Sequence, residues 1–148
     1  MIAPAEVART WIGTPYVHQA SHRGAGTDCL GLVRGVWREI CGREPEDVPP
    51  YTPDWSEPQR EETLWRAAER WLHAVPGARE MRSGEVLLFR MRTGSVAKHL
   101  GIVGRAGAAP TFIHAYSGRA VMESSLSQSW ARRIAARFDF PVSTSRKD

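Results

Sequence analysis

Residues 27–33 read Thr-Asp-Cys-Leu-Gly-Leu-Val and place Cys29 at the point where a helix should begin. Over residues 29–40 the apolar side chains recur at helical spacing, and Gly42 follows the end of this pattern. Either Thr27 or Asp28 can cap the first turn, because its side-chain oxygen can accept a hydrogen bond from a free backbone N–H group. We therefore predict a helix over residues 29–40 with a cysteine at its first position.

A cysteine at the start of a helix is well placed to act as a nucleophile. The helix dipole and the free backbone N–H groups favour the thiolate there, so we expect the pKa of the Cys29 thiol to fall. The neighbouring N–H groups could also bind the oxyanion that forms when a carbonyl is attacked, and Gly31 leaves space for a close backbone approach. The alternative for Cys29 alone is a small buried hydrophobic side chain, which is the commoner state of a free thiol.

Two of the five histidines can supply the base that such a thiol needs. His99 lies near the start of one predicted strand and His114 lies in the next. The short turn between these strands should make them hairpin neighbours, so the two imidazoles can approach each other on one face. One histidine would then act as the base and the other would orient it. Two ordinary strand histidines are the alternative.

Other chemistry has weaker support. Zinc could be held by Cys29, His99 and His114, or by His18 and His22, but the CxxC and HExxH spacings are absent. The glycines near residue 25 lack the Lys-Ser/Thr of a phosphate-binding loop, and no nucleic-acid-binding motif appears. The sequence therefore predicts no metal, no other cofactor and no nucleic-acid partner.

A disulfide between the two cysteines, Cys29 and Cys41, conflicts with the predicted helix. At a rise of about 1.5 Å per residue they would lie roughly 18 Å apart, whereas a disulfide needs Cα atoms within about 7 Å.

Helical patterns precede strand patterns along the chain, which indicates an α+β fold with helices packed on an antiparallel sheet. The predicted helices are residues 3–12, 29–40 and 58–73, the last with a possible capping box from Ser56 and Gln59. The predicted strands are residues 85–92, 98–104, 111–116, 121–123 and 133–140. Residues 18–27 and the proline-rich residues 44–58 read as loops. We expect a single domain over residues 1–141 and a short polar tail over residues 142–148.

Composition sets the remaining bounds. The 148 residues carry a formal net charge of +4, a mild basic bias that permits an anionic partner. No apolar stretch approaches the ~18 residues of a membrane helix, so we expect no membrane insertion. The N-terminus shows no secretory signal pattern, so we expect synthesis in the cytoplasm.

The ordered motifs resemble those of the NlpC family of cell-wall cysteine peptidases. Residues 13–16, Gly-Thr-Pro-Tyr, resemble the N-terminal element of the family, and residues 28–33 resemble its nucleophile motif. Residues 84–86, Gly-Glu-Val, resemble the strand that follows. Residues 99–102 and 112–115 resemble the segments that carry the base and the third polar residue.

This resemblance implies a papain-like core and a reaction in which a thiolate attacks an amide and the acyl-enzyme is then hydrolysed. By position, Cys29 would be the nucleophile, His99 the base, and His114 the residue that orients it. Tyr16 would lie beside the oxyanion site, and Asp28 would help to hold the free amine of a peptidoglycan stem peptide. The bond implied is the one between γ-D-glutamyl and diaminopimelic acid.

Two departures from the family pattern bear on function. Leu30 stands where many members have Ser. This substitution leaves the triad intact, but it bears on substrate preference because Leu30 lies next to the nucleophile. The sequence shows no wall-binding module and no signal peptide. Together with residues 28–31, 17–21 and 49–51, this resembles the branch encoded with phage tails and gene-transfer particles. That branch implies tail-tip or hub proteins as partners, and action on the periplasmic peptidoglycan of a recipient cell during entry. The alternatives are a structural or binding protein of the tail, and a papain-like amidase or acyl transferase.

Overall fold

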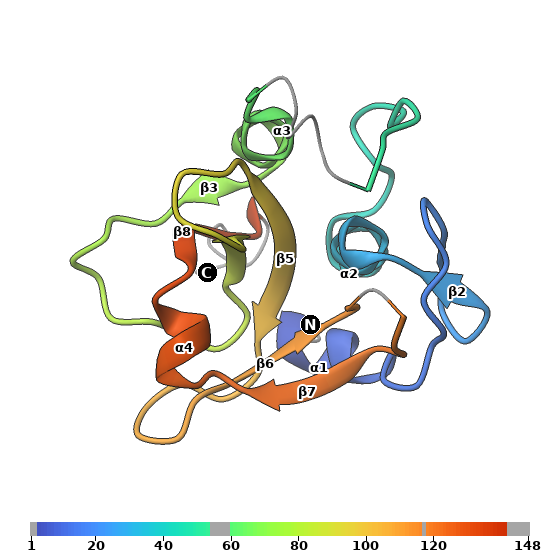
Figure 1. Ribbon diagram of the computed structural model, residues 1–148. Coiled ribbons are helices and arrows are strands. Elements are labelled where there is room, and N and C mark those ends of the chain that lie inside the picture. The colour runs from blue at the N-terminus through green and yellow to red at the C-terminus, as the bar shows by residue number, and fades with distance from the viewer. Residues whose placement is uncertain (1–2, 54–59, 117, 142–148) are drawn as a thin grey trace.

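The computed structural model describes residues 3–53, 60–116 and 118–141, and it has helices on both faces of an antiparallel sheet (Figure 1). Helices α1 (Pro4–Arg9), α2 (Cys29–Cys41) and α3 (Thr63–Trp71) lie on one side, and the short α4 (Gln128–Ala131) lies on the other. The predicted α+β class is therefore confirmed. Within these ranges, none of the helices has the length and apolar character needed to cross a bilayer.

The main sheet has six strands in the order β3-β8-β4-β5-β6-β7, and every neighbouring pair is antiparallel. All five predicted strands are present. The bounds are β3 (His73–Ala74), β4 (Val86–Arg90), β5 (Ala97–Val103), β6 (Thr111–His114), β7 (Met122–Ser125) and β8 (Ile134–Asp139). Strand β3 was not predicted: it begins at His73, the last residue that we expected to be helical, and it pairs with β8.

Strand β4 is buried on both faces and therefore contributes to two apolar cores. Val86 and Leu88 pack in the larger core, beneath α1, α2 and α3. Leu87 and Phe89 point the other way, into a smaller core closed by Trp130 of α4. A continuous run of apolar residues is what a strand covered on both faces requires, because successive side chains alternate between the faces.

Helix α2 begins at Cys29, as predicted, and ends one residue beyond the predicted end. The Asp28 side chain is its cap, since Oδ1 accepts a hydrogen bond of 2.7 Å from the backbone N–H of Gly31. Gly42 closes the other end with a φ of 92°, a conformation that favours glycine. The loop predicted before the helix instead contains a two-stranded hairpin, β1 (Ser21–His22) and β2 (Gly26–Thr27).

The other two predicted helices are shorter than expected. Helix α1 stops at Arg9, and the next residues continue as tight turns in which Trp11 and Ile12 donate to carbonyls three residues earlier. Helix α3 begins at Thr63, not at residue 58. The predicted capping box of Ser56 and Gln59 lies outside the described residues, as does the predicted polar tail over residues 142–148.

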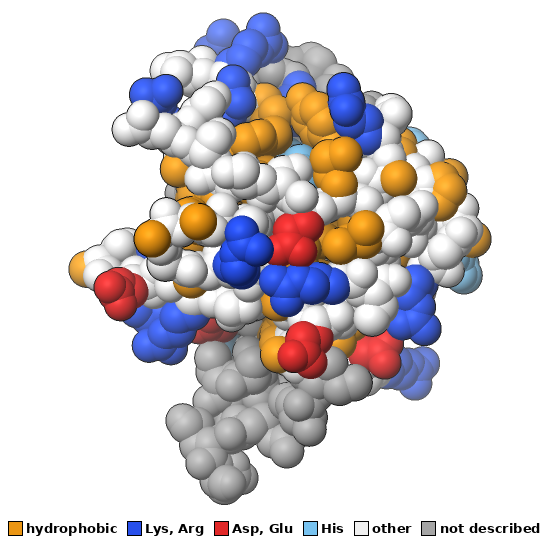
Figure 2. Space-filling view, turned by 90° about the horizontal axis from the view of Figure 1, so that it is seen from below, with side chains coloured by type: hydrophobic (Ala, Val, Ile, Leu, Met, Phe, Trp, Pro, Cys, Tyr) orange, Lys and Arg blue, Asp and Glu red, His pale blue; other side chains and the backbone are white. Residues whose placement is uncertain are grey.

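Charged side chains are spread over the surface, and many are paired. The face in Figure 2 shows acidic side chains beside basic ones in its middle part, and basic side chains among hydrophobic ones toward the top. Glu85 is buried and accepts hydrogen bonds from Arg79 at 2.6 Å and from Arg137 at 2.9 Å. Arg79 also reaches Asp139 at 2.8 Å, so this cluster joins the segment before β4 to β8.

The close approach at Gly31 gives a test of how α2 is held. A Cβ atom there would overlap the carbonyl oxygen of Ala20 and the hydroxyl of Thr27. We expect Gly31→Ala to lower the free energy of unfolding by about 1–3 kcal/mol, because buried backbone cannot give way cheaply. Urea unfolding of the purified protein measures this loss. Gly77→Ala is the matched control, since no atom lies within 4 Å of its added Cβ. Equal stability of the two variants would contradict this packing.

Candidate active site

The start of α2 opens onto a pocket of ≈ 410 Å³ that collects most of the predicted site residues. Cys29, His99, Tyr16 and Asp28 all line it, and they come from α2, β5 and the segment that leads into the helix. The Cys29 side chain is nearly covered, with 8% of the residue exposed. Both cysteines are free thiols, as expected from their positions on one helix.

His114 stands behind His99 and does not line the pocket. Strands β5 and β6 pair as the sequence predicted, and the two imidazoles meet on one face. His99 Nε2 lies 2.9 Å from His114 Nδ1, and His114 Nε2 lies 2.9 Å from Ser124 Oγ. The result is a hydrogen-bonded chain of three side chains from three adjacent strands.

Ser124 was missed by sequence reasoning because the predicted strand ended one residue before it. Its strand, β7, pairs with β6 and places His114 opposite Met122, two residues away from Ser124. Residues two apart along a strand share a face, so Ser124 and His114 point the same way. A strand extended by one residue would have been enough to identify it.

Aromatic rings enclose the two imidazoles. The ring of Trp130 lies 5.7 Å from that of His99 and 5.4 Å from that of His114. The ring centres of Phe112 and His114 are 4.1 Å apart. Those of Tyr116, which lines the pocket, and His99 are 5.5 Å apart. Helix α4, which carries Trp130, was not predicted because four residues are too short to show a periodic pattern.

Burial keeps both imidazoles neutral. It lowers the pKa of His99 to about 3, with a further contribution from His114, and it lowers the pKa of His114 to about 4. The charged form of each ring would lose its water without gaining a carboxylate partner. At neutral pH His99 therefore has a free lone pair and can accept a proton.

The expectation of a lowered pKa at Cys29 is wrong for this resting structure. Burial, together with the nearby Asp28 charge, raises the pKa of the thiol to about 12. Backbone hydrogen bonds from Leu100, Leu30 and Cys29 itself act in the opposite direction but are weaker. Helix-start stabilisation is present, yet desolvation of the anion outweighs it. The resting pair is therefore a neutral thiol and a neutral imidazole.

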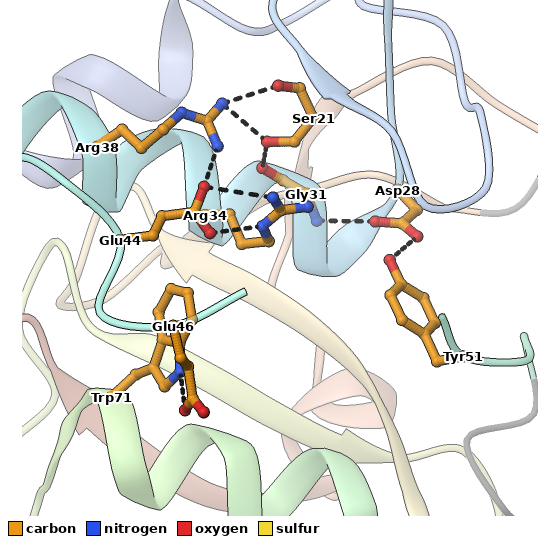
Figure 3. Close-up of polar contacts among 9 residues, drawn as sticks. All are labelled: Ser21, Asp28, Gly31, Arg34, Arg38, Glu44, Glu46, Tyr51 and Trp71. Atoms are coloured by element: carbon orange, nitrogen blue, oxygen red, sulfur yellow. Dashed lines mark hydrogen bonds and ion pairs between the residues drawn. The ribbon is translucent and has the colours of Figure 1, made fainter. Parts of the chain in front are cut away.

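Asp28 is the most heavily bonded side chain at the site. Oδ1 accepts from the backbone N–H of Gly31, and Oδ2 accepts from the hydroxyl of Tyr51 (Figure 3). Oδ2 also accepts from the backbone N–H of Gln19 at 2.7 Å. Only 4% of its side chain is exposed. This carboxylate holds the helix start and two loops together, and its predicted contact with a substrate amine stays a prediction.

Tyr16 lines the pocket together with Asp28. An isolated parallel β-bridge pairs the backbone of Tyr16 with that of Thr27 and fixes its position. Burial, together with the nearby Asp28 charge, raises the pKa of the Tyr16 phenol to about 12. The phenol is therefore a hydrogen-bond donor over the whole neutral range, which suits a group beside an oxyanion.

The proline-rich loop forms one wall of the pocket. Glu44 anchors it to α2 through Arg34 at 2.8 Å and Arg38 at 2.7 Å, and Glu46 accepts from Trp71 of α3 at 3.0 Å (Figure 3). At the far end the carbonyl of Tyr51 accepts from Gln19 at 2.7 Å, and Pro53 lines the pocket. Tyr51 therefore lines the pocket and bonds to Asp28, a role that the sequence did not reveal.

Leu30 lies away from the pocket of Cys29, and the described residues form no metal site. Leu30 lines a separate hollow with Pro49, Pro50 and Trp71, among others, and does not line the pocket of Cys29. Within residues 3–53, 60–116 and 118–141, no three or more His, Cys, Asp or Glu side chains are grouped so that they could hold a metal ion.

Comparison with known proteins agrees with this architecture. The model of the NlpC/P60 family matches residues 13–138. The chain is similar in fold to the crystal structure of the NlpC/p60 domain of the peptidoglycan hydrolase SagA, with 23% identity, a TM-score of 0.59, and coverage of 93% of this chain and 97% of that one. It is also similar to a lipoprotein-like NLP/P60 protein of Staphylococcus aureus, with 16% identity and a TM-score of 0.56, spanning 40% of that chain. No curated protein matches the sequence.

The depressed imidazole pKa values predict a specific loss of stability in acid. Between about pH 6.5 and pH 3 the imidazole of His99 is protonated in the unfolded chain but stays neutral in the native chain. The free energy of unfolding should therefore fall as the pH falls. His99→Gln should reduce this slope by up to about 1.4 kcal/mol per pH unit. Urea unfolding at a series of pH values measures it. His22→Gln, which changes an exposed histidine, is the control. Parallel slopes for wild type and His99→Gln would refute the assignment.

Proposed function

Because the chain belongs to the NlpC/P60 family and is therefore a cysteine peptidase, we propose that it hydrolyses amide bonds in the peptide part of bacterial peptidoglycan, with Cys29 as nucleophile and His99 as base. The observation that carries the proposal is one pocket lined by the thiol at the start of α2 and by an imidazole that a second imidazole orients. The structural neighbour described as a peptidoglycan hydrolase supports the substrate class.

The resting protonation states define the first step. Nε2 of His99 is occupied by His114, so Nδ1 is the nitrogen left to take the proton of the Cys29 thiol. The sulfur then attacks the substrate carbonyl, and the carbonyl electrons move onto oxygen. Since thiol and imidazole are both neutral at rest, proton transfer and attack proceed together when substrate fills the pocket.

The remaining steps return the site to its starting state. Backbone N–H groups at the start of α2 and the phenol of Tyr16 stabilise the oxyanion. His99 passes its proton to the leaving amine as the C–N bond breaks, which leaves a thioester on Cys29. A water molecule, deprotonated by His99, then releases the acid and regenerates the thiol.

The same route assigns a role to Ser124. If Nδ1 of His99 must stay unprotonated, Nε2 of His99 carries the proton and donates it to Nδ1 of His114. His114 must then be protonated on Nε2, and this N–H donates to Ser124 Oγ. Ser124 can accept this N–H, so it is a positioning residue that stabilises this tautomer of His114, and through it the tautomer of His99.

We further propose that the bond cut is the one between γ-D-glutamyl and diaminopimelic acid, and that a phage-like tail carries the protein to the wall. Two of the three segments that suggested the tail branch, residues 17–21 and 49–51, contact each other at the pocket. His18 Nε2 lies 2.9 Å from the carbonyl oxygen of Tyr51. Mass spectrometry of purified tail particles tests the placement, and absence of the protein from them would refute it.

Removal of the nucleophile is the direct test of the enzymatic proposal. Purified diaminopimelate-type peptidoglycan is incubated with wild type and with Cys29→Ala, and soluble products are identified by mass spectrometry. We expect wild type to release fragments cut after D-glutamate and Cys29→Ala to release none. The free energy of unfolding of Cys29→Ala should stay within about 1 kcal/mol of wild type. Cys41→Ala is the control, because Cys41 lies outside the pocket.

Other outcomes separate the alternatives. Identical products from wild type and Cys29→Ala would reject Cys29 as the nucleophile. Transfer of the acyl group to an added amine, in place of hydrolysis, would indicate an acyl transferase. No product from either protein would favour a structural or binding role in the tail.

Ser124→Ala tests the tautomer assignment. We expect kcat/KM to fall about threefold to tenfold, as for the loss of one hydrogen bond, and Ser124→Thr to restore most of the rate. Nitrogen-15 NMR of the imidazoles should show that His114 loses its single Nε2–H tautomer in the alanine variant. Ser125→Ala, on the same strand but exposed, is the control. An unchanged tautomer in Ser124→Ala would contradict this role.

A further inference from the structure

A basic hollow lies beside the pocket, between the end of β4 and α4. It has a volume of ≈ 740 Å³, and four arginines line it: Arg90, Arg92, Arg132 and Arg133. A smaller hollow of ≈ 270 Å³ shares Arg92 with it and adds Arg60. Among the described residues, none that lines either hollow is acidic. We call the larger one the arginine hollow.

Two of these arginines are held in place by other groups. Nη1 of Arg90 donates to Glu62 at 2.6 Å and to the carbonyl of Ser95 at 2.7 Å, at a point where the pairing register of β4 shifts. The guanidinium of Arg133 lies over the ring of Trp130, 5.6 Å from its centre. Guanidinium groups fixed in this way lose little freedom on binding an anion, which strengthens the contact.

The arginine hollow adjoins the pocket of Cys29. Met91 lines both of them, and Trp130, on which Arg133 rests, packs against the ring of His99. A ligand that extends from the pocket past Met91 therefore reaches the arginines.

The chemistry of the site indicates which part of a substrate takes this path. His99 must give its proton to the leaving amine, so the segment after the scissile bond lies on the side of His99. Met91 lines the pocket together with His99, and the arginine hollow begins at the same Met91, beside the Trp130 ring that packs on His99. The leaving segment of the peptide is thus directed toward the arginine hollow.

We propose that the arginine hollow binds carboxylates of the leaving segment of the substrate peptide. The inference rests on the proposed peptidase function and names a subsite of that same site. Arginine suits this ligand, because its planar fork can donate two parallel hydrogen bonds to one carboxylate. The proposed leaving segment begins with diaminopimelic acid, and its carboxylates can bind the arginines wherever they are not amidated or cross-linked.

Binding of the leaving segment can be measured apart from cleavage. The full chain carrying Cys29→Ala is titrated with the leaving fragment, diaminopimelyl-D-alanine, by isothermal calorimetry. The same fragment with its carboxylates amidated is the comparison ligand. We expect the free-acid fragment to bind about tenfold more tightly than the amidated one, with the difference shrinking in high salt.

The arginines are tested by replacing Arg92 and Arg132 together with Gln. We expect Arg92→Gln/Arg132→Gln to abolish the preference for the free-acid fragment. The control Arg43→Gln/Arg82→Gln removes the same charge from two exposed positions that line neither hollow, and it should keep the preference. Equal binding of both fragments, or an unchanged preference in Arg92→Gln/Arg132→Gln, would overturn the proposal.

Cleavage by wild type reports separately on the function. If wild type cuts a peptide substrate but the fragments bind equally, the peptidase proposal stands and the carboxylate subsite fails. If the fragments bind as expected but nothing is cut, the subsite stands as an anion-binding surface and the peptidase proposal fails.

Discussion

The carboxylate of Asp28 is the constraint on which the site depends. One oxygen caps α2 through the N–H of Gly31, and the other accepts from Gln19 and Tyr51. Three separate parts of the chain, namely the loop before the hairpin, the start of α2 and the proline-rich loop, are thereby fixed to one buried group. The position of Cys29 follows from this, because it is the residue next to the cap. A buried carboxylate without these donors would be costly, so the three segments must assemble together.

Burial sets the chemical character of the site more than the helix dipole does. The same covered environment raises the pKa of Cys29 and lowers the pKa values of His99 and His114, so every member of the chain is neutral at rest. Two neutral imidazoles need no counter-ion and can be enclosed by aromatic rings such as that of Trp130. Charge on the thiol, the imidazoles and the substrate carbonyl then appears only during the reaction, when the backbone N–H groups and Tyr16 can stabilise it.

Much of this arrangement could be predicted from the sequence, and the failures have physical reasons. Helix α2 has a long periodic pattern, and the β5–β6 hairpin brings together His99 and His114, so local sequence determines both. Strand β3 and helix α4 are short and owe their form to pairing with β8 and packing over the smaller core. The pKa of Cys29 was predicted in the wrong direction because desolvation depends on the atoms around the thiol, which no local pattern reveals. The contact between Tyr51 and Asp28 joins residues 23 apart and depends on the path of an irregular loop.

The double anchoring of the proline-rich loop has an evolutionary consequence. Glu44 is fixed to α2 by two arginines, and Tyr51 is fixed to the cap of the same helix by its hydroxyl. Between these anchors the chain runs from Arg34 and Arg38 of α2 back to the cap at the start of the same helix. Its prolines restrict the backbone. Insertions or deletions between Glu44 and Tyr51 would pull one anchor from its partner, whereas substitutions there would leave both in place. Divergence within this loop should therefore change its residues freely while its length stays constant.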